Sequence, residues 1–415
     1  MTVIPVRARV ARWRSSRWWS PWLAAAPAGL ALAVLLAVIE RSRLATTPFT
    51  TTDLHVYWLS GRAVRTGHDP YRYWLSTVHI SLVYPPFAGL LFVPLSLLSL
   101  ATLRIVWFTG IFAALELIVW WATGWVGLRA GWARLLLSFV AAAALPYFDP
   151  VREELWAGQI NVFLTLLIMA DLIRPDGARG RGAWIGVATG IKLVPGLFLV
   201  YFLLTRRIRE AAVGAAVFAL TVLAGFVTIP GPAWRYWTDY AWDANRVFPL
   251  PYISLNQSLR GSVARLLHRN DVTAWWAPVA VLVVAAGLAV CVALHRRGLD
   301  REGAMLCGVV ALLVSPITWA YHWVWLVPVL VVLVAGTWRA RAVPWAAGLW
   351  GLVTAVTFLA AVVHPYTWMP KYPVLPPHGP VKQLETSALV LVGLLLIAAG
   401  AALSWSRRDR PAPRS

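Results

Sequence analysis

The sequence predicts an all-α protein that crosses a membrane many times. Hydrophobic residues make up 60% of the 415-residue chain, and charged residues only 13%, about half the share found in soluble domains. Many apolar blocks reach the roughly 20 residues that a helix needs to cross the hydrocarbon core. We therefore predict one integral-membrane domain over residues 1–415, with about 10–12 transmembrane helices.

The formal net charge of +20 would indicate nucleic-acid binding in a soluble protein. In a membrane protein, arginines of the inner loops face anionic lipid instead, so we predict membrane lipid and no nucleic acid as partner. The two cysteines, Cys291 and Cys307, lie within or beside hydrophobic segments. Two cysteines provide neither a disulfide framework nor a metal site.

The chain begins with an arginine-rich stretch, residues 1–20, followed by the apolar residues 21–39. That apolar run is long for a cleaved signal peptide and lacks small residues at its end, so it predicts an uncleaved signal anchor. Residues 41–101 are predicted to form the first outer loop. Within it, the proline-bearing stretch 84–100 is short and predicts a surface-lying or half-inserted helix.

The remaining apolar stretches predict membrane spans. They lie near 102–122, 132–148, 159–174, 209–229, 274–295, 303–318, 320–337, 344–363 and 386–404. The stretch 183–204 is long enough to span, but Lys192 and Pro195 interrupt its middle. We interpret it as a discontinuous or re-entrant pair, because broken backbone at membrane depth must line a cavity.

The distribution of arginine predicts the orientation of the chain. With both termini in the cytoplasm of a plasma-membrane protein, most basic residues fall in inner segments, as the positive-inside rule requires. The loops 41–101 and 230–273 then lie outside, together with nearly all unusual polar residues. ATP is absent from that face, and the sequence has no phosphate-binding glycine loop. Any chemistry there needs an activated donor delivered through the lipid.

Asp53 is the strongest candidate for a catalytic group. A carboxylate at the outer interface can accept a proton from an attacking hydroxyl. The alternative is structural, because Thr51-Thr52-Asp53 before an apolar-periodic run is also a good helix N-cap.

His322 and Lys192 are the other two candidates for the reaction centre. The imidazole of His322 can bind a phosphate or take part in proton transfer, although an interfacial histidine in an aromatic belt is the alternative. Lys192 is the only lysine within the hydrophobic segments, and a lipid phosphate is its natural partner. The alternatives are a lysine that extends to the interface or one paired with a buried carboxylate such as Asp171.

Several further side chains are predicted to contact substrate. Amides can hydrogen-bond sugar hydroxyls, and aromatic rings suit polyprenyl and carbohydrate contact. Helix–helix hydrogen bonds, loop solvation and interfacial anchoring are the alternative roles. The residues assigned in this way are Tyr57, Tyr84, Glu153, Gln159, Asn161, Asn256, Gln257 and Trp319. Glu153 and Glu154 form an acidic pair without a histidine cluster, so no metal or other cofactor is predicted.

Taken in chain order, these motifs resemble those of glycosyltransferase family 87, a family of integral-membrane enzymes of the GT-C type. The resemblance rests on Asp53 with the following Val-Tyr-Trp, Tyr-Pro-Pro-Phe (84–87), Gly-Gln-Ile-Asn (158–161) with Asp171, and the run 186–195 ending in Lys-Leu-Val-Pro. Asn-Gln-Ser (256–258) and Ser-Pro-Ile-Thr-Trp (315–319) before His322 complete it. Singly each motif is weak, but the ordered set covers most of the chain and is specific.

The resemblance implies a β-linked polyprenyl-phosphate-mannose donor, an α-1,2 mannoside product and a general base at Asp53. It implies a mannosylated lipid acceptor, either a phosphatidylinositol mannoside or lipomannan, and assigns His322 to the site. The family also leads us to expect a polar residue just before His322, where this chain has Ala320-Tyr321. Two alternatives stay open: a polyprenyl-phosphate arabinose donor, and transport of a lipid or sugar. Transporters usually contain repeated halves, which this sequence lacks.

Overall fold

The structure is a computed structural model that describes residues 51–72, 80–247, 250–367 and 379–406. This part of the chain is helical, and an isolated β-bridge pairs Asn256 with Trp319. The α-helices, in order, are α2 Thr52–Arg65, α3 Pro86–Leu91, α4 Leu100–Trp125, α5 Trp132–Ala144, α6 Asp149–Ala157, α7 Asn161–Leu172, α8 Ala183–Ile191, α9 Leu197–Leu204, α10 Ile208–Thr228, α11 Pro230–Arg235, α12 Ala244–Val247, α13 Leu259–Leu267, α14 Thr273–His295, α15 Asp300–Val314, α16 Leu326–Ala340, α17 Pro344–Val363, α18 Pro380–Thr386 and α19 Ala388–Ser406.

The predicted class, a helical protein with several membrane spans, is confirmed. Six helices among the described residues are long and apolar enough to cross a membrane: α4, α10, α14, α16 with the preceding 3₁₀ turn η6 (Ala320–Trp325), α17 and α19. A seventh span is possible if Trp132–Tyr147 and α6 count as one helix pair, bent by 75°. This number is below the predicted ten to twelve. The proposed anchor at 21–39 lies outside the described residues.

Two predicted spans are shorter than their apolar runs. In place of 159–174, α7 has 12 residues, because the α6–α7 turn occupies Gly158 to Ile160. Gly158 has a φ of 69°, a left-handed conformation that glycine adopts without steric cost. In place of 303–318, α15 begins earlier, at Asp300, and ends at Val314, since Ser315 precedes a proline and adopts an extended ψ of 136°.

Segment 183–204 is broken, as predicted. α8 ends at Ile191, and Lys192 has extended dihedrals of φ −151° and ψ 129°. A 3₁₀ turn at Val194–Gly196, with Pro195 inside it, then leads into α9. The break places Lys192 between two half-helices instead of on the side of one long helix.

Asp171 fixes the other end of α8, and so is not the partner of Lys192. Its Oδ2 accepts the Ile185 N–H at 2.9 Å, and its Oδ1 lies 3.5 Å from Arg174 Nη1. A carboxylate at a helix N-terminus satisfies unpaired N–H groups and is favoured by the helix dipole. Asp171 therefore orients the half-helix whose far end carries Lys192.

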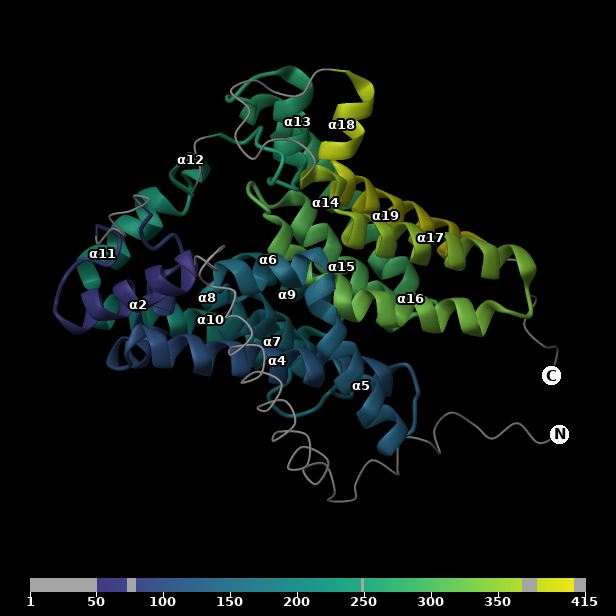
Figure 1. Cartoon of the computed structure of the whole chain (residues 1–415), viewed down its shortest axis with the longest axis horizontal. Coiled ribbons are helices and arrows are strands. Elements are labelled where there is room, and N and C mark those ends of the chain that lie inside the picture. Colours follow the sequence, from purple (N-terminus) through teal and green to yellow (C-terminus); the bar gives the residue numbers. More distant parts are fainter. Residues whose placement is uncertain (1–50, 73–79, 248–249, 368–378, 407–415) are drawn as a thin grey trace.

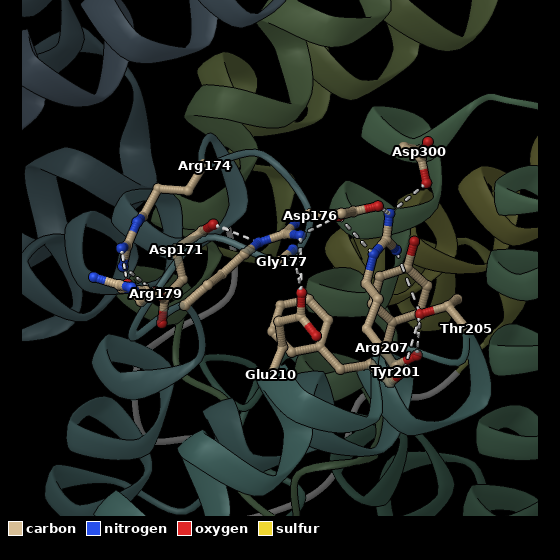
Figure 2. Close-up of polar contacts among 12 residues, drawn as sticks. Asp171, Arg174, Asp176, Gly177, Arg179, Tyr201, Thr205, Arg207, Glu210 and Asp300 are labelled. Atoms are coloured by element: carbon tan, nitrogen blue, oxygen red, sulfur yellow. Dashed lines mark hydrogen bonds and ion pairs between the residues drawn. The ribbon is translucent and has the colours of Figure 1, made fainter.

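The three connections α7–α8, α9–α10 and α14–α15 are joined by charged side chains, shown in Figure 2. We call Asp176, Arg181, Arg207, Glu210 and Asp300 the interloop clamp. Arg207 donates to Asp176 Oδ1 at 2.9 Å through Nε and to Asp300 Oδ1 at 2.9 Å through Nη2. Arg181 also pairs with Asp176, and Glu210 Oε1 accepts the Gly177 N–H at 2.7 Å. Burial alone would raise the pKa of Asp176, but the bonds from Arg207 and Arg181 bring it below its usual value.

Figure 1 shows how these elements enclose the site. α16, α17 and α19 run beside one another on one side, while α2 and the helices from α4 to α10 form the other. The two groups meet where α6 and α7 pack against η6, and where α4 packs against α16. The predicted loops 41–101 and 230–273 themselves contain short helices, among them α2, α3, α11 and α13.

Candidate active site

Helix α2 carries Asp53 in its first turn, with Tyr57 one turn later on the same side. Asp53 is not the N-cap, which is Thr51 and makes no side-chain capping bond. Thr51 instead has a left-handed φ of 42°, an unfavourable conformation for a β-branched residue. Its N–H donates to Trp156 O at 3.0 Å, and its Oγ1 accepts from Arg104 Nε at 2.9 Å. The start of α2 is thus fixed by α4 and α6.

Close approach of the α6–α7 turn to α2 requires a glycine at position 158. A Cβ there would lie 2.7 Å from Leu54 Cβ, and the φ of +69° is itself unfavourable for other residues. The following residue, Gln159, is buried under α2. Its Oε1 accepts hydrogen bonds from Tyr57 Oη at 2.9 Å, Tyr84 Oη at 3.0 Å and Asn161 Nδ2 at 3.3 Å. Three donors therefore fix the orientation of the Gln159 amide.

The Gln159 side chain also hydrogen-bonds Asp53. Since its Oε1 already accepts three bonds, its Nε2 is the group that donates to the carboxylate. Burial raises the pKa of Asp53 from 3.8 to about 6, although the Gln159 bond and the charge of Lys192 act in the opposite direction. Burial and the charge of Asp53 raise the pKa of Tyr84 above its usual range, so this phenol stays a donor. The raised pKa allows Asp53 to exchange a proton near neutral pH.

Asn161 links this cluster to Lys192. Its Oδ1 accepts from Lys192 Nζ at 2.9 Å, and its Nδ2 donates to Glu154 Oε2 at 3.0 Å. The other Glu154 oxygen accepts the Val162 N–H at 2.9 Å at the start of α7. Lys192 Nζ also lies 5.1 Å from the ring centre of Tyr84, within the range of a cation–π interaction. The lysine is therefore held between the amide of Asn161 and the face of Tyr84.

His322 completes the polar cluster from η6. The Trp319 N–H donates to His322 Nδ1 at 2.8 Å, so a neutral imidazole carries its proton on Nε2. That Nε2 contacts Lys192 Nζ. Lys192 Nζ and His322 Nε2 thus lie at the same place, where a protonated Lys192 and the Nε2–H of His322 can both donate to a ligand. An anion bound there would accept from both side chains, which makes this pair a candidate phosphate site.

A groove extends from Lys192 and His322, and the space between its atoms is about 500 Å³ when the part open to the surroundings is counted. Its polar end contains Asn161 and Thr318. Its walls are apolar and come from α7, α9, α15 and η6, with Leu164, Ile168, Phe198, Leu312 and Trp325 among them. An amphiphile with an anionic head and a long apolar chain fits both the polar end and the walls.

Seven predicted site residues converge in one cluster: Asp53, Tyr57, Tyr84, Gln159, Asn161, Lys192 and His322. They come from five separate stretches of sequence, on both sides of the molecule.

Asn256 and Gln257 lie elsewhere and bind the backbone. Asn256 donates to Pro251 O at 3.0 Å and accepts the Thr318 N–H at 3.1 Å. Gln257 donates to Thr386 O at 2.7 Å and accepts the Leu389 N–H at 3.1 Å. Both amides are buried and tie the stretch before α13 to the loop after α15 and to the start of α19. In this structure they support the loop that carries His322; their predicted contact with substrate stays a prediction.

Glu153 and Trp319 lie at the edge of the cluster. Glu153 is half-buried, with Oε1 3.7 Å from Arg152 Nη2, whereas the adjacent Glu154 is fully buried in the cluster. Trp319 contributes its backbone N–H to His322 and its ring is half-buried. Their substrate contacts also stay predictions.

Glu154 is the main site residue that the sequence reasoning missed. Its signal is helical periodicity, because Val151, Glu154 and Leu155 share the buried face of α6 while Glu153 lies off it. Tyr321, at the position where a polar residue was expected, lies within electrostatic range of Asp53 and Glu154. Within the described residues, no three His, Cys, Asp or Glu side chains are grouped closely enough to hold a metal ion.

Comparison with known proteins matches the chain to one family and to relatives named as mannosyltransferases. Residues 82–316 match the family description glycosyltransferase family 87, a region that includes Lys192 but neither Asp53 nor His322. Over 354 residues, 81% of this chain and 80% of the relative, it is 32% identical to the polyprenol-phosphate-mannose-dependent alpha-(1-2)-phosphatidylinositol pentamannoside mannosyltransferase of Mycobacterium tuberculosis (strain CDC 1551 / Oshkosh).

A second relative comes from Mycolicibacterium smegmatis (strain ATCC 700084 / mc(2)155). It is named polyprenol-phosphate-mannose-dependent alpha-(1-2)-phosphatidylinositol mannoside mannosyltransferase, and is 31% identical over 77% of each chain. No solved structure matches this chain.

Proposed function

The chain belongs to glycosyltransferase family 87, and from this premise we propose that it transfers mannose from polyprenyl-phosphate mannose to a mannosylated phosphatidylinositol lipid. The product carries a new α-1,2 linkage, formed on the extracytoplasmic face of the plasma membrane. The observation that carries the proposal is the convergence of Asp53, Lys192 and His322 at the polar end of an apolar groove. The names of the relatives support the donor and the acceptor class.

The groove suits the donor. Its apolar walls accommodate the polyprenyl chain, and the phosphodiester accepts hydrogen bonds from Lys192 Nζ and His322 Nε2–H at the polar end, beside the place where the two side chains meet. The mannose then extends from the phosphate toward Asp53 and the Gln159 amide, whose orientation is fixed by Tyr57 and Tyr84. Placement of the sugar by a hydrogen-bonded network lowers the entropy cost of reaching the transition state.

In the reaction, an acceptor hydroxyl forms a bond to the anomeric carbon from the face opposite the phosphate, while the bond from that carbon to the phosphate oxygen breaks. The hydroxyl proton passes to Asp53. The polyprenyl phosphate leaves with one more negative charge, which Lys192 and His322 stabilise. Because this leaving group accepts the bonding electron pair as an anion, no general acid is needed and one carboxylate suffices.

This role for Asp53 predicts the dependence of rate on pH. A general base must be deprotonated, and burial raises the pKa of Asp53 to about 6. We expect kcat/KM for the acceptor to rise about tenfold per pH unit below 6 and to level off above it. Steady-state rates between pH 4.5 and 8 test this. A profile that is flat across this range would contradict proton transfer to Asp53.

The function itself is tested by comparing donors with the purified protein. We expect transfer of radiolabelled mannose from polyprenyl-phosphate mannose to a phosphatidylinositol mannoside, and no transfer from polyprenyl-phosphate arabinose. Digestion of the product with an α-1,2-specific mannosidase should release the label. Activity with the arabinose donor alone would overturn the assignment of the sugar. Movement of labelled donor across the bilayer of a proteoliposome without any product would instead indicate a transporter.

A further inference from the structure

A second groove lies between α9, α14 and α19, outside the candidate active site. The space between its atoms is about 1620 Å³ when the part open to the surroundings is counted. Its floor is hollow because small residues, Ala285, Ala289 and Ala293, recur every four residues along α14, opposite Ala401 of α19. This spacing places the three alanines on one side of the helix.

The groove ends at the face of the protein opposite the candidate active site. Arg296 and Arg297, which follow α14 directly, line this end. They precede α15, whose 15 residues span about 22 Å before the loop that leads to His322. Trp405 also lines this end and is 73% exposed, as expected of a tryptophan at a membrane interface. The open groove therefore runs from the apolar flank of the bundle to a cationic interface.

The two arginines are available for an external anion. In the adjacent interloop clamp, Asp176 and Asp300 pair with Arg207 (Figure 2). Asp176 also pairs with Arg181. No carboxylate of the described residues lies within 4.0 Å of a charged nitrogen of Arg296 or Arg297, since neither forms an ion pair. The clamp thus uses the acidic groups of this face internally and leaves the arginines at the groove unneutralised.

We propose that this groove binds one anionic diacyl phospholipid of the leaflet opposite the active site. The headgroup phosphate contacts Arg296 and Arg297, and the acyl chains lie along the alanine floor between α14 and α19. The apolar residues Leu204, Leu288 and Val292 along the groove suit contact with acyl chains. A bound lipid would also fill a packing gap between α9, α14 and α19, of which α9 and α14 lead into connections joined by the clamp.

Native mass spectrometry of the purified protein, titrated with phosphatidylglycerol or phosphatidylcholine of identical acyl chains, tests the proposal. We expect one phosphatidylglycerol to bind in preference to phosphatidylcholine. The double variant R296Q/R297Q should weaken phosphatidylglycerol binding by roughly 30-fold, because each basic residue near an anionic lipid contributes about fivefold. Ala289→Phe should weaken both lipids, since its side chain fills the floor.

Two control variants separate this site from general charge and from the active site. R129Q/R209Q removes the same charge from two exposed arginines outside the groove, and should bind phosphatidylglycerol as the wild type does. Lys192→Gln should also retain the lipid, since Lys192 lies in the other groove. Equal loss in R129Q/R209Q, loss in Lys192→Gln, or equal affinity for the two headgroups would each overturn the proposal. Thermal unfolding of each variant identifies any that fail to fold.

Discussion

Asp53→Asn should reduce mannosyl transfer by about 10²–10⁴-fold, the usual contribution of a positioned general base. Asparagine has the same shape as aspartate and can still bond to Gln159, so the substrate contacts should remain. The loss should therefore appear in kcat, while donor binding changes little. The residual rate should also lose its dependence on pH near 6, because the group with the raised pKa is gone. Initial rates with saturating donor and acceptor provide the measurement.

The matched control for this variant is Asp239→Asn. Asp239 is an exposed carboxylate in the predicted outer segment 230–273 and forms no ion pair with the described residues, so its replacement should leave the rate unchanged. If Asp53→Asn folds and binds donor yet transfers mannose at the wild-type rate, then Asp53 is not the base. Its place in the first turn of α2 would then reflect only the favourable interaction of a carboxylate with a helix N-terminus.

Most of the fold was predictable because lipid imposes a simple rule on sequence. A helix that crosses the membrane needs a long apolar run, so the predicted spans 209–229, 274–295, 344–363 and 386–404 match α10, α14, α17 and α19 within two residues. The break at Lys192 was also predictable, because a charged residue and a proline at membrane depth seldom lie within an uninterrupted helix.

The errors arose where an apolar run extends beyond the end of a helix. The runs 159–174 and 303–318 include backbone that turns, at Gln159-Ile160 and at Ser315-Pro316, next to the candidate site. These turns present Gln159 and lead to His322. Hydrophobicity measures the free energy of transferring a segment to lipid. It does not distinguish a helix in lipid from a turn that is buried against other parts of the protein, so it did not reveal the ends of α7 and α15.

The motifs predicted the family and most members of the polar cluster, but not their partners. Gln159, Asn161 and Lys192 were identified singly, whereas their chain of hydrogen bonds depends on how α6, α7 and α8 pack. For Asn256 and Gln257, the sequence suggests amide groups that are free to bind substrate. In the structure these amides bond to backbone 62 and 129 residues away. Pairings over such separations follow from the tertiary fold and have no local signal.

Lys192→Met should lower kcat/KM for the donor by about 10²–10³-fold, comparable with the loss of one hydrogen-bond donor from a site that stabilises a developing anion. Methionine keeps most of the length and removes the charge. The charge on the phosphate increases as the bond to the sugar breaks, so the cation contributes more in the transition state than in the bound donor. Both an increase in KM and a decrease in kcat are therefore expected. Lys382→Met, at an exposed lysine of α18, is the control and should behave as the wild type.

Comparison with His322→Ala distinguishes binding of one shared anion from independent roles. If the Nζ of Lys192 and the Nε2–H of His322 contact the same phosphate, their contributions are coupled, and the double variant should lose much less than the product of the two single losses. If the loss in the double variant equals the product of the two single losses, the two side chains act independently and do not bind the same phosphate. Lys192→Met with unchanged kcat/KM would remove Lys192 from the reaction and leave it as a support for Asn161. The coupling energy thus tests the arrangement of donors on which the mechanism depends.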